Sequence, residues 1–216
     1  MENLARQFYR DHKKVLALIK SQSCCSGFEP AVYRLFGDNP IRGATANIGG
    51  HEFRYSNLSR NLLSFLPETW CKELEKVRGA WSGCQNWWAG YPFITWIEMR
   101  AGDDGIAATL ILNAEIGPIS NHKVRTGLIG AVKAEALARG LERVQFSAGA
   151  TDKGRLYSRF FRQNSVKIDD IRNTNLVELR LMELITGFAS EFELVSSVIP
   201  SCFARKRSIQ TALTVC

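Results

Sequence analysis

The sequence predicts an α+β fold, with an antiparallel or mixed sheet built from hairpins and with helices packed on one face. Two observations lead to this prediction. Apolar residues recur on both sides of turn residues at 44–56 and at 92–115, which is typical of β-hairpins. Segments with helix-spaced apolar residues separate and follow these hairpins, as in folds whose helices cover one side of a sheet. With 216 residues, 45% of them hydrophobic, the chain can bury a sizeable core.

The first part of the chain predicts three helices, one hairpin and a loop. Gly37 ends the second helix, Gly49-Gly50 forms the hairpin turn, and Pro67 lies in the first turn of the third helix, where its missing N–H is tolerated. The loop is rich in Gly and Trp. In chain order these elements are helices at 3–20 and 28–36, the hairpin at 44–56, the helix at 66–77 and the ordered loop at 78–92.

The hairpin at 92–115 is the clearest element of the sequence. Its turn is expected near Asp103 and Asp104, and side chains then alternate between two faces of the sheet. One face is apolar and belongs to the core, while the other is mixed. The core face carries Phe93, Thr95, Ile97, Met99, Ala108, Leu110 and Leu112, and the mixed face carries Ile94, Trp96, Glu98, Arg100, Thr109, Ile111, Asn113 and Glu115.

The rest of the chain predicts two helices, two strands and one ambiguous segment. Gly140 ends the first helix, whose Gly127 and Gly130 favour close packing on a sheet, and Asn173 or Thr174 caps the second. In order the elements are a helix at 121–140, strands at 142–149 and 165–168 with the ambiguous segment 154–163 between them, and a helix at 173–195. The predicted domains are an N-terminal helical segment at 1–40, an α+β domain at 41–199 and a loosely structured basic tail at 200–216.

The charge of the chain is concentrated in one window. Residues 121–167 hold ten cations and three acids, a surplus that equals the +7 net charge of the whole protein. Such a basic region favours a polyanionic partner, and the alternative is an ordinary solvated surface. The charged N-terminus and the absence of a long apolar run predict a cytoplasmic protein that does not bind membranes.

Several catalytic classes are excluded by missing motifs. The sequence has no phosphate-binding loop of the form G-x-x-x-x-G-K-[ST] or G-x-G-x-x-G. It also lacks the G-x-S-x-G turn that carries a nucleophilic serine and the H-E-x-x-H motif of zinc proteases. Six cysteines and three histidines lack the spacing of a zinc site, so no metal and no cofactor are expected. Mg²⁺ would be needed only by a metal-dependent nuclease, for which Glu98 and Glu115 on the mixed face are the candidate carboxylates. No residue is identified as catalytic.

Segment 154–163 carries the strongest binding signal. As a short helix or turn it places Arg155, Arg159 and Arg162 on one stripe, because they follow one another at helical spacing. Guanidinium groups can each hold two phosphate oxygens, which favours sequence-independent binding to a DNA or RNA backbone. Salt bridges to nearby acids are the alternative. The predicted nucleic-acid-binding residues are Lys123, Arg125, Lys153, Arg155, Arg159, Arg162 and Lys167.

The tryptophan-rich segment 81–96 allows two interpretations. Its aromatic side chains can stack on bases, or they can form a core that holds the loop against the sheet, and the core interpretation is favoured. If the tryptophans were exposed, the segment could instead be the contact surface of a protein-interaction domain.

The sequence resembles the C-terminal region of bacterial PD-(D/E)XK nuclease superfamily proteins in three stretches. They are "GCQNWWAGYPFITWIEM", "LNAEIGPISNHKVR" and "GATDKGRLYSRFFRQNSVKIDDI". The resemblance covers about residues 3–195. In those longer chains the nuclease core lies upstream of a helix like "LARQFYRDHKKVLALI", and the catalytic [E/Q]-x-K matches no position here. The resemblance therefore implies an accessory or C-terminal domain in DNA processing or defence, acting alone or beside a nuclease or other protein partner.

Overall fold

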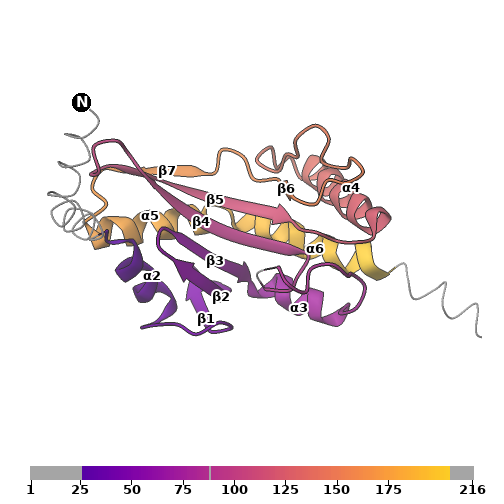
Figure 1. Ribbon diagram of the computed structural model, residues 1–216, viewed down its shortest axis with the longest axis horizontal. Helices are drawn as coiled ribbons and strands as arrows, with labels where there is room; N and C mark the ends of the chain where they lie inside the picture. The colour runs from indigo at the N-terminus through magenta and orange to yellow at the C-terminus, as the bar shows by residue number, and fades with distance from the viewer. Residues whose placement is uncertain (1–25, 88, 205–216) are drawn as a thin grey trace, which may run out of the picture.

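The computed structural model describes residues 26–87 and 89–204, and in them five helices accompany a seven-stranded sheet (Figure 1). The predicted helix at 3–20 and the end of the chain after Ala204 lie outside the described residues. The elements are α2 (Phe28–Phe36), β1 (Thr45–Ile48), β2 (His51–Ser59), β3 (Leu62–Pro67), α3 (Glu68–Lys76), β4 (Phe93–Ala101), β5 (Ala108–Ile116), α4 (His122–Ala138), β6 (Ser158–Arg159), β7 (Ser165–Ile168), α5 (Thr174–Thr186) and α6 (Ala189–Ala204).

All strand pairs of the sheet are antiparallel, as in a meander. The strand order is β1-β2-β3-β4-β5-β6, and β7 pairs with the other end of β5. The hairpin predicted at 44–56 is confirmed, because Ile48 pairs with His51 across Gly49 and Gly50, both of which have positive φ angles. The predicted α+β class with an antiparallel sheet is therefore confirmed.

The hairpin of β4 and β5 has the two faces that the sequence predicts, but its register is shifted by two residues. Ile94 pairs with Glu115, whereas a turn centred on Asp103 and Asp104 would pair it with Asn113. The turn lies one residue later because the Asp104 carboxylate accepts hydrogen bonds from the N–H groups of Ile106 and Ala107. The shift is even, so every side chain keeps its predicted face.

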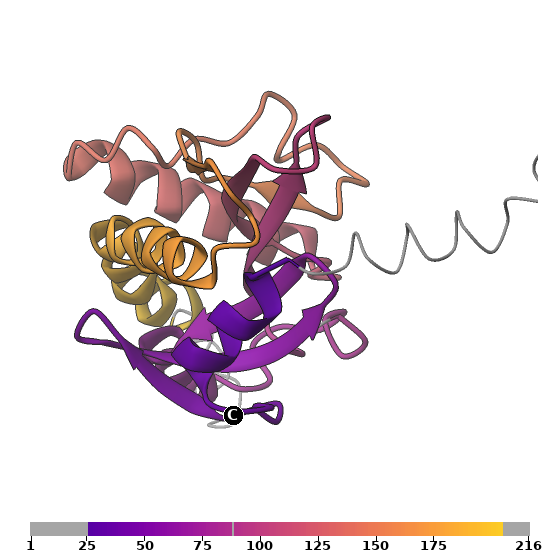
Figure 2. The same cartoon turned by 90° about the vertical axis from the view of Figure 1, so that its left-hand side faces the viewer.

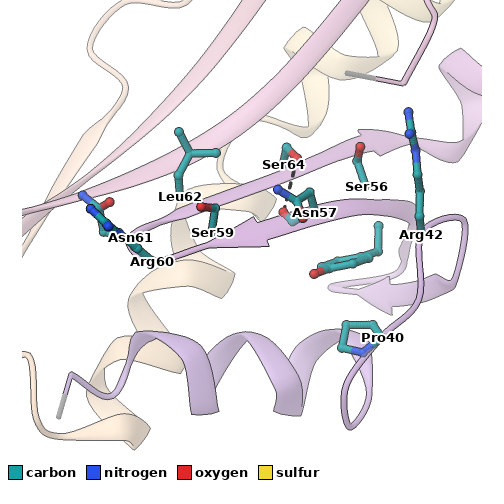
Figure 3. A pocket seen from close by; sticks show the side chains of 10 residues that line it. Pro40, Arg42, Ser56, Asn57, Ser59, Arg60, Asn61, Leu62 and Ser64 are labelled. Atoms are coloured by element: carbon teal, nitrogen blue, oxygen red, sulfur yellow. Dashed lines mark hydrogen bonds between the residues drawn. The ribbon is translucent and has the colours of Figure 1, made fainter. Parts of the chain in front are cut away.

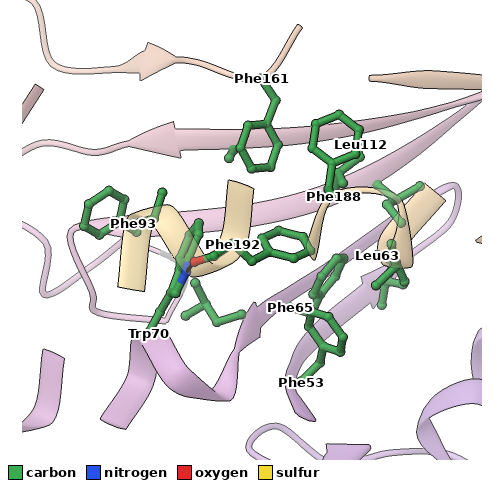
Figure 4. Close-up of a cluster of buried hydrophobic side chains, with 14 of the residues drawn as sticks. Phe53, Leu63, Phe65, Trp70, Phe93, Leu112, Phe161, Phe188 and Phe192 are labelled. Carbon is green, nitrogen blue, oxygen red and sulfur yellow. Dashed lines mark hydrogen bonds between the residues drawn. The ribbon is translucent and has the colours of Figure 1, made fainter. Parts of the chain in front are cut away.

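The helices gather on the sheet face that carries Phe53, Phe65 and Phe93 (Figures 2 and 4). Phe192 of α6 lies in the middle of this core, with its ring 5.6 Å from Phe53 and its carbonyl accepting from the Trp70 indole N–H at 2.7 Å. Helix α4 in turn packs on α6. The rings of α2, α3 and α6 thus meet the sheet in one continuous core.

Helix α3 confirms the predicted helix at 66–77, but it begins at Glu68. Leu66 and Pro67 end strand β3 instead, which forms a further hairpin with β2. Two other secondary-structure predictions are wrong. The helix at 173–195 is divided into α5 and α6, where Phe188 enters the core and lies 4.8 Å from the ring of Phe161. Residues 142–149 make only one isolated bridge, between Val144 and Phe161.

Helix α4 confirms the predicted helix at 121–140 but not the role of its glycines. Asn121 caps it by accepting from the Val124 N–H at 3.2 Å. Gly127 and Gly130 are exposed, and a methyl group at either position would meet no atom within 4 Å. The prediction that they allow close packing on the sheet is therefore wrong. Among the described residues, no helix is both long and apolar enough to cross a membrane.

Candidate nucleic-acid interface

Residues 154–163 form a mostly extended segment rather than the predicted short helix or turn. Ser158 and Arg159 form strand β6, which pairs with Ile116 and Glu115 at the end of β5. Farther along, Phe160 donates its N–H to Ala114 and accepts from the N–H of Gln145. A helix is not formed because these main-chain groups pair with strand β5 and with Gln145, and local side-chain spacing does not reveal such pairing.

The extended conformation still brings the three arginines of this segment together. They line one hollow of about 560 Å³, which we call the arginine hollow. It is formed by Glu115, Ser147, Gly154, Arg155, Leu156, Tyr157, Arg159 and Arg162. Glu115 is the only acid in that set. The predicted grouping of the arginines is thus present, although it arises from a strand and its flanking turns.

Two of these arginines have no carboxylate within ion-pair distance in the part of the chain that the structure describes. The Arg155 Nε donates to the carbonyl of Tyr157 at 3.1 Å. The Arg162 guanidinium donates to the carbonyls of Phe161 at 2.9 Å and Arg159 at 3.5 Å. Carbonyl groups orient a guanidinium without neutralising its charge, so both groups keep a full positive charge available to an anion.

Arg159 lies between an aromatic ring and a carboxylate. Its guanidinium carbon is 4.9 Å from the centre of the Trp96 ring, and its Nε is 3.8 Å from an oxygen of Glu115. The β5–β6 register accounts for this arrangement, because Arg159 and Glu115 are directly paired. The Arg159 side chain nevertheless stays 54% exposed, and a distance of 3.8 Å indicates a loose ion pair.

Glu115 is a partly desolvated carboxylate beside several cations. Burial raises its pKa above the ordinary glutamate range, and the charges of Arg159, Arg125 and Arg155 oppose that rise. The net rise means that removal from water outweighs the attraction to the arginines. Glu115 is therefore a carboxylate that takes up a proton more readily than an exposed glutamate.

Arg125, one of the predicted binding residues, lies in the interior. It is 1% exposed, and its guanidinium donates to the carbonyls of Ala150 and Leu156 and to the hydroxyl of Ser158. It therefore supports the loop that carries the arginine hollow and is not itself open to a phosphate. The sequence contained a signal for this burial, because Arg125 lies on the same helical stripe as Leu128 and Val132.

The predicted lysines are spread over three places. Lys153 is exposed and directly precedes Gly154, which lines the arginine hollow. Lys123 borders a different hollow between α4 and α6, together with Ser201. Lys167 pairs with Thr109 near the far end of β5, roughly 20 Å along the strand from Glu115. Of the three, Lys153 alone adjoins a residue of the arginine hollow in the chain.

Other cations of the basic window have structural partners. Arg143 forms a two-pronged ion pair with Glu191, which is 1% exposed, and its guanidinium carbon lies 4.0 Å from the centre of the Phe188 ring. Arg139 pairs with Glu135 at 2.7 Å one helical turn away. These contacts account for part of the positive surplus, and they leave the arginine hollow as the place where uncompensated arginines converge.

The carboxylates proposed for a metal-dependent nuclease are not brought together. Glu98 pairs with Ile111 in the hairpin, four residues along β5 from Glu115, which is roughly 13 Å. Glu98 is also bound to Arg100 at 2.9 Å. Among the described residues no three histidine, cysteine or acidic side chains form a group suited to a metal ion. The geometry does not favour this alternative.

A second hollow, of about 750 Å³, lies beside strands β2 and β3 (Figure 3). Its lining is mostly neutral and polar, with serine and asparagine side chains, and Arg42 and Arg60 are its charged members. No carboxylate, histidine or cysteine occurs in that lining, so it offers no general base or nucleophile–base pair. Its chemistry is less specific than that of the arginine hollow.

Comparison with known proteins does not indicate a function for this chain. No family model, curated protein or solved structure matches the chain. The case for function therefore rests on the geometry of the arginine hollow and on the chemistry of its side chains.

Proposed function

We propose that this protein binds the phosphate backbone of a nucleic acid through the arginine hollow. The observation that supports the proposal is the convergence of Arg155, Arg159 and Arg162 on one hollow, two of them without a carboxylate partner among the described residues. Lys153, which directly precedes Gly154 of the hollow, adds a further exposed cation. A guanidinium binds two oxygens of a phosphate at once, so this group is well suited to consecutive phosphates of a strand.

Binding of this kind is independent of base sequence. Contacts to phosphates fix the position of a protein on the strand, whereas sequence is read at the base edges. Such binding is also steeply dependent on salt, because each phosphate contact releases bound counterions. Three contacts predict roughly a twentyfold to fortyfold loss of affinity between about 50 and 200 mM salt.

The proposed context is an accessory domain in DNA processing or defence, as the resemblance to PD-(D/E)XK nuclease proteins implies. In that context the chain holds the nucleic acid, and a nuclease or other protein partner performs the cleavage. The proposed location is the cytoplasm. The proposed function requires neither a metal ion nor a catalytic group of this chain, because binding uses only fixed positive charges.

The test is fluorescence anisotropy with labelled DNA and RNA at about 50 and 200 mM salt. The triple variant R155A/R159A/R162A is compared with R34A/R78A/R172A, which removes the same charge from exposed arginines outside the arginine hollow. We expect the affinity of the first variant at low salt to be at least about tenfold lower. The slope of its log affinity against log salt concentration should fall by the equivalent of about two to three phosphate contacts. The second should bind much as the unmodified protein does.

Either of two results would overturn the proposal. One is the absence of binding by the unmodified protein at low salt. The other is an equal loss in both triple variants, which would show that net charge rather than the arginine hollow determines binding. Circular dichroism of each variant establishes that the fold is intact before the affinities are compared.

A further inference from the structure

Tyr157 lines the arginine hollow and contacts Trp87, which itself packs on Gly117. Trp87 packs so closely on Gly117 that a methyl group there would lie 2.1 Å from the Trp87 ring. The ring of Tyr157 in turn lies 6.0 Å from the ring of Trp87, tilted by 47°. Trp87 supports the tyrosine from one side, while 43% of Tyr157 remains exposed. An aromatic ring supported in this way can serve as a platform.

We infer that the arginine hollow takes a single-stranded nucleic acid, with one unpaired base stacked on Tyr157. This inference rests on the proposed function and specifies its ligand. The same hollow presents the tyrosine ring beside Arg155 and Arg159, so a phosphate contact and a stacking contact lie within one site. Proteins that bind single strands combine these two features, a cationic surface for the backbone and an aromatic ring for a base.

A duplex cannot use the tyrosine in the same way. Its bases are stacked on each other and paired, so a base must leave the stack before it can lie on an outside ring. A single strand offers unpaired bases at no such cost. Stacking also tolerates any base, because every base has a flat π-face, and this agrees with the absence of a base-reading requirement in the proposed function.

The experiment separates the base from the backbone. Fluorescence anisotropy at about 50 mM salt compares a single-stranded DNA oligonucleotide, an abasic oligonucleotide of the same length and a duplex. The proteins are the unmodified chain, Tyr157→Ala, Tyr157→Phe and the control Tyr33→Ala, which removes a tyrosine on α2 outside the hollow. Truncation of the partly exposed Tyr157 leaves the carbonyl that holds Arg155 in place.

For the unmodified protein, Tyr157→Phe and Tyr33→Ala, we expect the base-containing single strand to bind at least about fivefold more tightly than the abasic strand. Tyr157→Ala should lose that difference, so that its affinities for the two strands become equal. If the unmodified protein binds the single strand, the abasic strand and the duplex equally, the inference is wrong and the proposed function stands. If it binds none of them, the proposed function fails as well.

Discussion

The guanidinium of Arg125 on helix α4 donates a hydrogen bond of 2.6 Å to the hydroxyl of Ser158 on strand β6. The same guanidinium donates to the Ala150 carbonyl at 2.8 Å, and the Ser158 hydroxyl donates to that carbonyl too. One buried cation thus fixes both ends of the loop between Ala150 and Ser158. That loop carries Arg155 and Tyr157, so the geometry of the arginine hollow depends on a residue that does not line it.

Replacement of Arg125 by alanine should therefore destabilise the protein. The change removes three hydrogen bonds, to the carbonyls of Ala150 and Leu156 and to the hydroxyl of Ser158, and each lost bond costs on the order of 1 kcal/mol. We expect the free energy of unfolding to fall by about 3 kcal/mol, measured by urea denaturation. Lys123→Ala, on the exposed side of the same helix, should change it by less than about 0.5 kcal/mol. Equal effects of the two changes would contradict the role assigned to Arg125.

Acidification should strengthen binding to nucleic acid. The pKa of Glu115 is raised by burial, so this carboxylate gains a proton at a higher pH than an exposed glutamate does. Protonation removes the negative charge beside Arg159, while the phosphate groups of the ligand stay ionised. The affinity should rise as the pH falls through the raised pKa of Glu115. Anisotropy titrations from about pH 4, close to the pKa of an exposed glutamate, up to about neutral pH measure the effect.

Glu115→Gln provides the matched control for this pH dependence. The amide cannot ionise, so we expect tighter binding at neutral pH and a flatter pH profile. The raised pKa also means that ionisation of Glu115 opposes folding, so the stability it lends is present at low pH and is lost as the pH rises through the folded-state pKa. The glutamine variant should therefore unfold at higher urea concentration at neutral pH. A variant with the pH profile of the unmodified protein would contradict this account.

The thiols of Cys71 and Cys84 should be unreactive in the folded protein. Burial raises the pKa of Cys71 to about 12 and that of Cys84 to about 11, and the thiolate is the reactive form. Iodoacetamide at pH 8, roughly the ordinary range of a free thiol pKa, should leave both unmodified until urea unfolds the chain. Peptide mass spectrometry resolves the two sites. Rapid modification of either thiol without denaturant would show that the site is open to solvent.

The grouping of the three arginines was predicted, but for the wrong conformation. Arg155 and Arg159 come together because β6 pairs with β5 and because turns flank it, not because they share a helical stripe. Arg125 was predicted on the surface and lies in the interior, although its position on the apolar stripe of α4 was readable in the sequence. The neighbouring Glu115 was predicted on the mixed face, but its pairing with Arg159 depends on a strand contact between residues far apart in the chain.

The sequence by itself determined the features that depend on near neighbours. Gly49 and Gly50 turn the first hairpin, Asn121 begins α4, and the alternation of β4 selects its core face. Tertiary structure decided the rest, because a main-chain group that is removed from water takes whichever partner the fold presents. Phe160 finds that partner in Ala114 and Gln145, so the segment is extended, and the arginines on either side are thereby brought around one hollow.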